Sequence, residues 1–166
     1  MKDWIPVIVA AIAAVAALTG YLVNGAISRR SELTRHYADA LAEFEKYRQL
    51  PFTFHRRHDS TSQTRAELAN MMGENQAALA FYRRSLQLGS PSVGLAYARL
   101  VDKIREKNSA YRMQALSSPS VQHDVDIEIG RRYTYDIKDE LDECVKLMRR
   151  ELKLFKWPNR RCGKRH

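Results

Sequence analysis

The chain has 166 residues, which leaves room for one membrane span and one compact domain of about 135 residues. Its 28 Lys and Arg residues against 19 Asp and Glu residues give a net charge of +9. This excess suits a negatively charged partner, either an anionic lipid surface or a nucleic acid. The two cysteines, Cys144 and Cys162, argue against a disulfide framework and indicate reduced thiols.

Residues 5–27 form an apolar run without a single charged side chain. A helix of this length covers about 34 Å, which is enough to cross a hydrocarbon layer of about 30 Å. Trp4 precedes the run, and Arg29 with Arg30 follows it. We therefore predict a transmembrane helix over residues 5–27, preceded by a short N-terminus of residues 1–4.

A cleaved signal peptide and a buried soluble helix are the alternatives to a membrane anchor. A signal peptide would have a positive N-terminal region and an apolar core of about 7 to 15 residues. Here Lys2 and Asp3 nearly cancel, and the apolar run is longer. Basic residues gather after the run, so the positive-inside rule predicts a single-pass protein of the cell membrane, with the N-terminus outside and the C-terminal domain in the cytoplasm.

One face of the predicted span carries small and polar residues. Ala16, Gly20 and Asn24 follow one another at intervals of four residues. Small residues allow two helices to approach closely in lipid, and an Asn side chain can form a hydrogen bond across the contact. These three residues predict self-association through the span, although alanine is also a common helix former in any setting.

Four amphipathic segments follow, each with apolar residues at intervals of three or four. The first is expected to run out of the span as far as about Leu50, where Pro51 is expected to end it. The others are expected to cover about 60–89, 91–116 and 136–155. Their boundaries rest on cap and turn residues: a capping box of Ser60 and Gln63, Gly89 as C′, Ser90-Pro91 at a helix start, and Pro158 as a stop.

Such helices can bury their apolar stripes only against one another, which predicts an all-α fold. The span would continue into a cytoplasmic four-helix bundle of residues 28–157, followed by a basic tail of residues 158–166. Within 121–135, apolar and acidic residues alternate as in a strand. Because one short run cannot form a sheet alone, we expect an ordered loop or an extended segment there.

No catalytic, cofactor or metal site is expected. His55, His58 and Asp59 provide too few ligands for a structural zinc site, and no GxSxG motif or Gly-rich phosphate loop is present. Four arginines near the predicted membrane surface are candidate contacts for anionic lipid head groups: Arg29, Arg30, Arg56 and Arg57. The runs that mix basic and aromatic residues are short and separated, so a nucleic-acid partner is not expected.

Several short motifs are distributed over most of the chain. They are Arg29-Arg30, YADAL at 37–41, LPF at 50–52, Arg56-Arg57, TRAEL at 64–68, SPSVGLAY at 90–97 and MRREL at 148–152. With these motifs the chain resembles a group of short membrane-anchored proteins from high-GC Gram-positive bacteria and from their phages and mobile elements. The resemblance implies one span and a helical cytoplasmic domain, and it implies no activity.

The sequence favours a non-enzymatic, membrane-anchored helical protein that interacts with itself, with anionic lipid and with a protein partner that the sequence does not identify. Two alternatives remain open at this point. One is a phage or defence-system effector that assembles and perturbs the bilayer. The other is a nucleic-acid binder tethered to the membrane.

Overall fold

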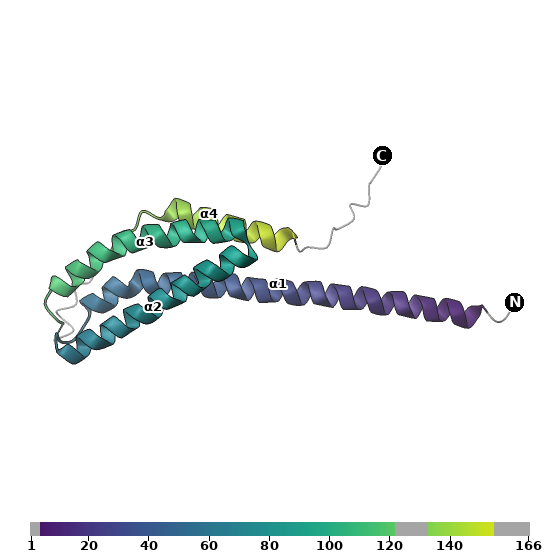
Figure 1. Cartoon of the computed structure of the whole chain (residues 1–166), viewed down its shortest axis with the longest axis horizontal. Coiled ribbons are helices and arrows are strands. Elements are labelled where there is room, and N and C mark those ends of the chain that lie inside the picture. Colours follow the sequence, from purple (N-terminus) through teal and green to yellow (C-terminus); the bar gives the residue numbers. More distant parts are fainter. Residues whose placement is uncertain (1–3, 122–132, 155–166) are drawn as a thin grey trace. The chain divides into compact units, whose positions relative to one another are not determined.

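The computed structural model describes residues 4–121 and 133–154. Within these ranges every regular element is an α-helix: α1 (Ile5–His55), α2 (Ser62–Gly89), α3 (Pro91–Ser117) and α4 (Lys138–Leu154) (Figure 1). The all-α prediction is therefore confirmed for the described residues. The expected strand-like alternation falls largely on residues 122–132, which lie outside the described residues, as does the basic tail.

The chain divides into two compact units, one of residues 1–37 and 151–166 and the other of residues 38–150. In the first unit, the Tyr37 side chain is buried and its hydroxyl donates a hydrogen bond to the Glu151 carboxylate. The apolar N-terminal part of α1 is long enough, and apolar enough, to cross a membrane, and none of its apolar window is buried. Its length and composition suit a membrane span or a signal sequence.

The core of the second unit is built mainly on α3. Its stripe of Val93, Tyr97, Leu100 and Ile104 is fully buried, as the spacing of these residues predicts. Burial of each such side chain contributes about 1.5 to 3 kcal/mol. From α1, Phe44 and Tyr47 join this core, and from α4 Cys144 does so. The helices of this unit therefore share one apolar interior.

Hydrogen bonds and ion pairs connect α3 to its neighbours in the second unit. The hydroxyl of Tyr97 donates to the carbonyl oxygen of Ala40 in α1 at 2.9 Å. On the other side, Arg99 pairs with Glu143 of α4 at 2.8 Å, and Lys103 pairs with Glu140 at 2.6 Å. Both ion pairs are at least partly exposed, so they help to orient α4 on α3 but add little to the free energy of unfolding.

The predicted end of the first helix at Leu50 is wrong, because α1 continues through Pro51 to His55. A proline inside a helix has no N–H, so the carbonyl four residues earlier loses its helical donor. Here that carbonyl belongs to Tyr47, and the side-chain amide of Asn108 in α3 donates to it at 2.5 Å. The lost bond is thus replaced by a tertiary one, and the helix continues.

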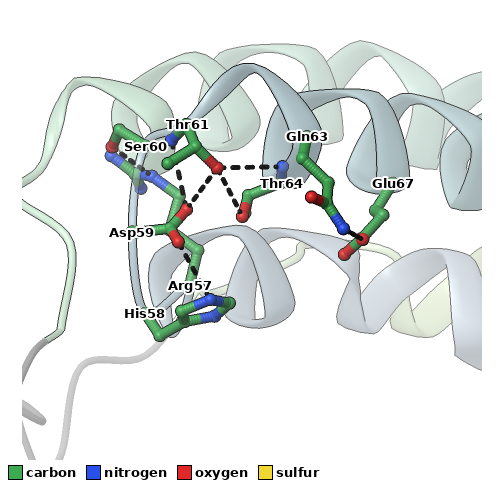
Figure 2. Close-up of polar contacts among 8 residues, drawn as sticks. All are labelled: Arg57, His58, Asp59, Ser60, Thr61, Gln63, Thr64 and Glu67. Carbon is green, nitrogen blue, oxygen red and sulfur yellow. Dashed lines mark hydrogen bonds and ion pairs between the residues drawn. The ribbon is translucent and has the colours of Figure 1, made fainter.

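The predicted cap of α2 is displaced by one residue. Thr61, not Ser60, is the N-cap, and its hydroxyl accepts a hydrogen bond from the backbone N–H of Thr64 at 3.3 Å (Figure 2). Ser60 instead accepts a hydrogen bond from Nε of Arg57 at 3.2 Å. The capping-box role of Gln63 is also wrong, since its side chain donates to Glu67 one turn further along the helix.

Helices α2 and α3 lie side by side and are joined by one residue, Ser90 (Figure 1). The prediction that Ser90-Pro91 opens α3 is confirmed, because Ser90 is the N-cap and Pro91 the first helical residue. Gly89, expected as a C′ residue, is instead the last residue of α2. The two helices approach closely at Gly94, where an added Cβ would lie 2.5 Å from the Cα and N atoms of Gln87.

Helical spacing predicts core positions for Met71 and Met72 of α2 and for Leu141 and Met148 of α4. The prediction is wrong for Met71, which is 37% exposed, and confirmed for Met148, which is buried. Met72 and Leu141 are half-buried, and Met72 packs against a buried cluster that includes Phe54. The buried apolar side chains of α2 are those of Leu68, Leu79 and Leu86.

Candidate functional site

The three predicted contact residues of the span lie on the N-terminal part of α1. Ala16, Gly20 and Asn24 are all exposed, and a Cβ added at Gly20 would meet nothing within 4 Å. Within the described residues, Asn24 makes no hydrogen bond, so its amide remains available for a partner outside the chain. Self-association through these three residues is not tested by these observations and stays a prediction.

Another polar residue in this stretch is satisfied internally. The hydroxyl of Thr19 donates to the carbonyl oxygen of Val15 at 2.7 Å. A hydroxyl bonded in this way to its own helix can be placed in lipid at little cost. Asn24 therefore differs from Thr19, because its amide has both donors and an acceptor to satisfy.

The predicted lipid contacts fall into two groups. Arg29, Arg30 and Arg56 are exposed, and their role at lipid head groups stays a prediction. Arg57 is different, since only 7% of its surface is exposed. Its guanidinium is directed at protein carbonyls rather than at solvent, so the structure assigns it a role inside the fold instead of at the membrane.

Arg57 connects the ends of two helices. Nη1 donates to the carbonyl oxygens of Phe54 at 2.9 Å and Ala115 at 2.7 Å, and Nη2 donates to those of Leu116 at 3.0 Å and Ser118 at 2.5 Å. The last carbonyls of a helix have no intrahelical donor and carry partial negative charge. The buried guanidinium therefore satisfies C-terminal carbonyls of both α1 and α3. The partial negative charge of these carbonyls in turn compensates the positive charge of the guanidinium.

The turn from α1 to α2 is ordered by Asp59 (Figure 2). One carboxylate oxygen accepts hydrogen bonds from the backbone N–H and the hydroxyl of Thr61, at 3.1 and 3.0 Å. Hydrogen bonding from the Thr64 side chain and from the Thr61 backbone lowers the pKa of Asp59. The carboxylate thus stays ionised and holds the first turn of α2.

The described residues contain no group of three or more His, Cys, Asp and Glu side chains that could hold a metal ion. His58 instead has its Nε2 atom 3.0 Å from Oδ2 of Asp59. A second group of polar residues in the sequence, His123, Asp124 and Asp126, lies outside the described residues.

A cavity of about 580 Å³ opens beside Arg57, between the end of α1, the start of α2 and the C-terminal half of α3. Arg65 and Arg112 line it together with Arg57, and apolar side chains form much of the remaining wall. Sequence patterns did not single out Arg65 or Arg112. They lie on two helices that are far apart in the chain, and only the tertiary packing brings them to one cavity.

Comparison of the chain with protein-family models, with curated proteins and with solved structures finds no match. The resemblance that rests on short motifs therefore stays a prediction.

Proposed function

We propose that the chain is a non-enzymatic, membrane-anchored interaction protein. The apolar part of α1, residues 5–27, is the anchor, and residues 28–157 form a four-helix bundle that is presented in the cytoplasm. Two or more copies associate through the face of the span that carries Ala16, Gly20 and Asn24. The bundle offers a surface to a protein partner, and the exposed arginines near the end of the span contact anionic lipid.

One observation carries the proposal: none of the apolar window of α1 is buried by the described parts of the chain. Val15, Leu18 and Leu22, for example, each expose more than half of their surface. Such a stretch needs lipid or a second copy to cover it. On the face of the span that carries Asn24, a second copy is favoured over lipid. An unsatisfied amide in hydrocarbon is costly, and lipid tails offer no hydrogen bond.

Disulfide cross-linking in native membranes tests the proposed contact. In a Cys162→Ser background, we expect Ala16→Cys to form an intermolecular disulfide under mild oxidation. Leu18→Cys and Leu22→Cys are matched controls, since a helical period of 3.6 residues places them on the far side of the span. Equal cross-linking at all three positions would contradict a specific contact.

Two further variants distinguish assembly through the span from assembly through the bundle. Gly20→Leu should hold the two helices apart, and Asn24→Leu should remove a polar contact worth about 0.6 to 2 kcal/mol. Gly25→Leu is the matched control, since this glycine lies about 140° from Gly20 around the helix and an added Cβ there also meets nothing within 4 Å. The proposal requires both variants to lower the yield of the Ala16→Cys cross-link while the control leaves it unchanged.

A further inference from the structure

The cavity beside Arg57 has the composition of a binding site for an anion with an apolar part. Its volume of about 580 Å³ lies within the range of ligand pockets, about 300 to 1,000 Å³. Leu68 and Met72 of α2 and Met113 and Leu116 of α3 contribute its apolar wall. Three arginines line it, and none of the described residues that line it is acidic. The wall is therefore apolar and positively charged at once.

Among the residues that the structure describes, no carboxylate forms an ion pair with these arginines. Arg57 donates to four backbone carbonyls and to the hydroxyl of Ser60, whereas Arg65 and Arg112 take part in no ion pair within the described residues. Nη1 of Arg112 is buried and has no hydrogen-bond partner in the part of the chain that the structure describes. A buried charged group without an acceptor is costly, so the guanidinium of Arg112 favours an anion in the adjacent cavity that compensates its charge.

Arg112 lies between the core and the cavity. Its Cζ atom lies 5.8 Å from the centroid of the Tyr47 ring, a cation–π contact with the face of that ring. The N–H groups at its edge match the oxygens of a phosphate or carboxylate. Arg65 provides a second positive charge from α2, at the same cavity.

Beside these charges the apolar wall is unusually exposed. Met113 is 68% and Leu116 42% exposed, although both follow the buried stripe of α3 closely in sequence. Methionine side chains are flexible and adapt to apolar ligands of different shape. Exposed apolar side chains of this size next to unpaired arginines favour a ligand that covers both.

We propose that this cavity binds a small anionic amphiphile, a single apolar chain that ends in a phosphate or carboxylate. The anionic head accepts hydrogen bonds from Arg112 and Arg65, and the apolar chain lies against Leu68, Met72 and Met113. This binding goes beyond the proposed anchoring and assembly, and it does not depend on the orientation or self-association of the span.

The methionines provide a direct test. We use the full chain in zwitterionic nanodiscs with ¹³C-methyl methionine and titrate it with decyl phosphate. The methyl resonances of Met72 and Met113 should shift and saturate, whereas that of Met148, buried elsewhere in the core, should not. Arg112→Gln and Arg65→Gln should each weaken binding at least tenfold. Arg84→Gln, an exposed arginine of α2 outside the cavity, should leave it unchanged.

Three results would overturn the proposal. The first is an equal response to decyltrimethylammonium, which would show that the charge of the head group is irrelevant. The second is an equal response to inorganic phosphate alone, which would show that the apolar chain contributes nothing. The third is equal binding by Arg65→Gln and Arg84→Gln. Arg65 is exposed, so Arg65→Gln should stay folded even if Arg112→Gln unfolds. An unchanged Met148 resonance in the Arg65→Gln variant would verify that its core is intact.

Discussion

The side-chain amide of Asn108 donates a hydrogen bond to the backbone carbonyl of Tyr47, with a distance of 2.5 Å between Nδ2 and the oxygen. Pro51 lies four residues after Tyr47 and has no N–H to offer this carbonyl. Asn108 is completely buried, and its Oδ1 atom accepts a hydrogen bond from the hydroxyl of Tyr135 at 2.5 Å. A buried amide in α3 therefore allows α1 to contain a proline.

Asn108→Ala should destabilise the fold by about 1 to 3 kcal/mol, because it leaves the buried carbonyl of Tyr47 without a donor. Asn70→Ala, an exposed position in α2, is the matched control and should change stability by less than about 0.5 kcal/mol. Urea denaturation of the full chain in detergent, followed by circular dichroism, measures both.

Pro51→Ala restores the missing backbone N–H and with it a helical donor for Tyr47. Asn108→Ala should therefore cost less in the Pro51→Ala background than in the parent chain, a coupling of about 0.5 kcal/mol or more. Strictly additive effects in this double-mutant cycle would show that the amide does not replace the helix bond.

The end of α1 shows what local patterns cannot predict. A proline after a periodic stretch normally marks a boundary, and that rule placed the end of the helix at Leu50. The structure continues to His55 because Asn108 supplies the compensation from a distant point in the chain. The buried stripe of α3, in contrast, was predictable, since its spacing alone indicates which side of the helix faces the core.

Gly94→Ala should destabilise the contact between α2 and α3. The added methyl group would lie 2.5 Å from the backbone of Gln87, so one of the two helices must shift, at a cost of about 1 to 3 kcal/mol. Gly73→Ala is the control, because a Cβ there meets nothing within 4 Å and alanine favours the helix by about 0.5 to 1 kcal/mol. In thermal denaturation, the midpoint temperature should be lower for Gly94→Ala than for the parent chain and higher for Gly73→Ala.

Arg57→Lys should be strongly destabilising even though it keeps the charge. A lysine ammonium cannot reproduce the planar fork that donates to the carbonyls of both α1 and α3, and the unmet carbonyls cost about 2 to 4 kcal/mol. Arg56→Lys, at the exposed neighbouring position, should change the free energy of unfolding by less than about 0.5 kcal/mol. Similar effects of the two substitutions would contradict the assigned role of Arg57.

Arg57 and the arginines of the cavity also show why a site is harder to predict than a helix. In the sequence, Arg56 and Arg57 are equivalent members of one basic pair. Their roles separate only in the fold, because the turn that follows α1 buries Arg57 and leaves Arg56 exposed. Arg65 and Arg112 line the same cavity only because α2 packs against α3. No short motif in the sequence predicts that packing.

Cys144 should react slowly with thiol reagents in the folded chain. Burial raises the pKa of its thiol from 9.0 to about 11, and the nearby Glu143 acts in the same direction. The thiolate fraction at pH 8 is then about a hundredfold smaller than for the ordinary thiol. The folded chain binds this proton more tightly than the unfolded chain, so stability should also decrease as the pH rises from 9 towards 11.

The rate of modification in a Cys162→Ser variant, followed with and without denaturant, isolates the Cys144 thiol. Denaturant should accelerate the reaction strongly at pH 8. A native rate equal to the denatured rate would show that Cys144 is not part of the core.

Orientation of the anchored domain is the most direct test of the proposed function, and it needs a reporter other than the buried Cys144. Lys107 is exposed on α3, so Lys107→Cys in a Cys162→Ser background provides an accessible thiol. We expect the protein in the membrane fraction to resist a membrane-impermeant maleimide in intact cells and to react after permeabilisation, because positive charge follows the span. Equal labelling of Lys107→Cys before and after permeabilisation would place the helical domain outside the cytoplasm and contradict the account.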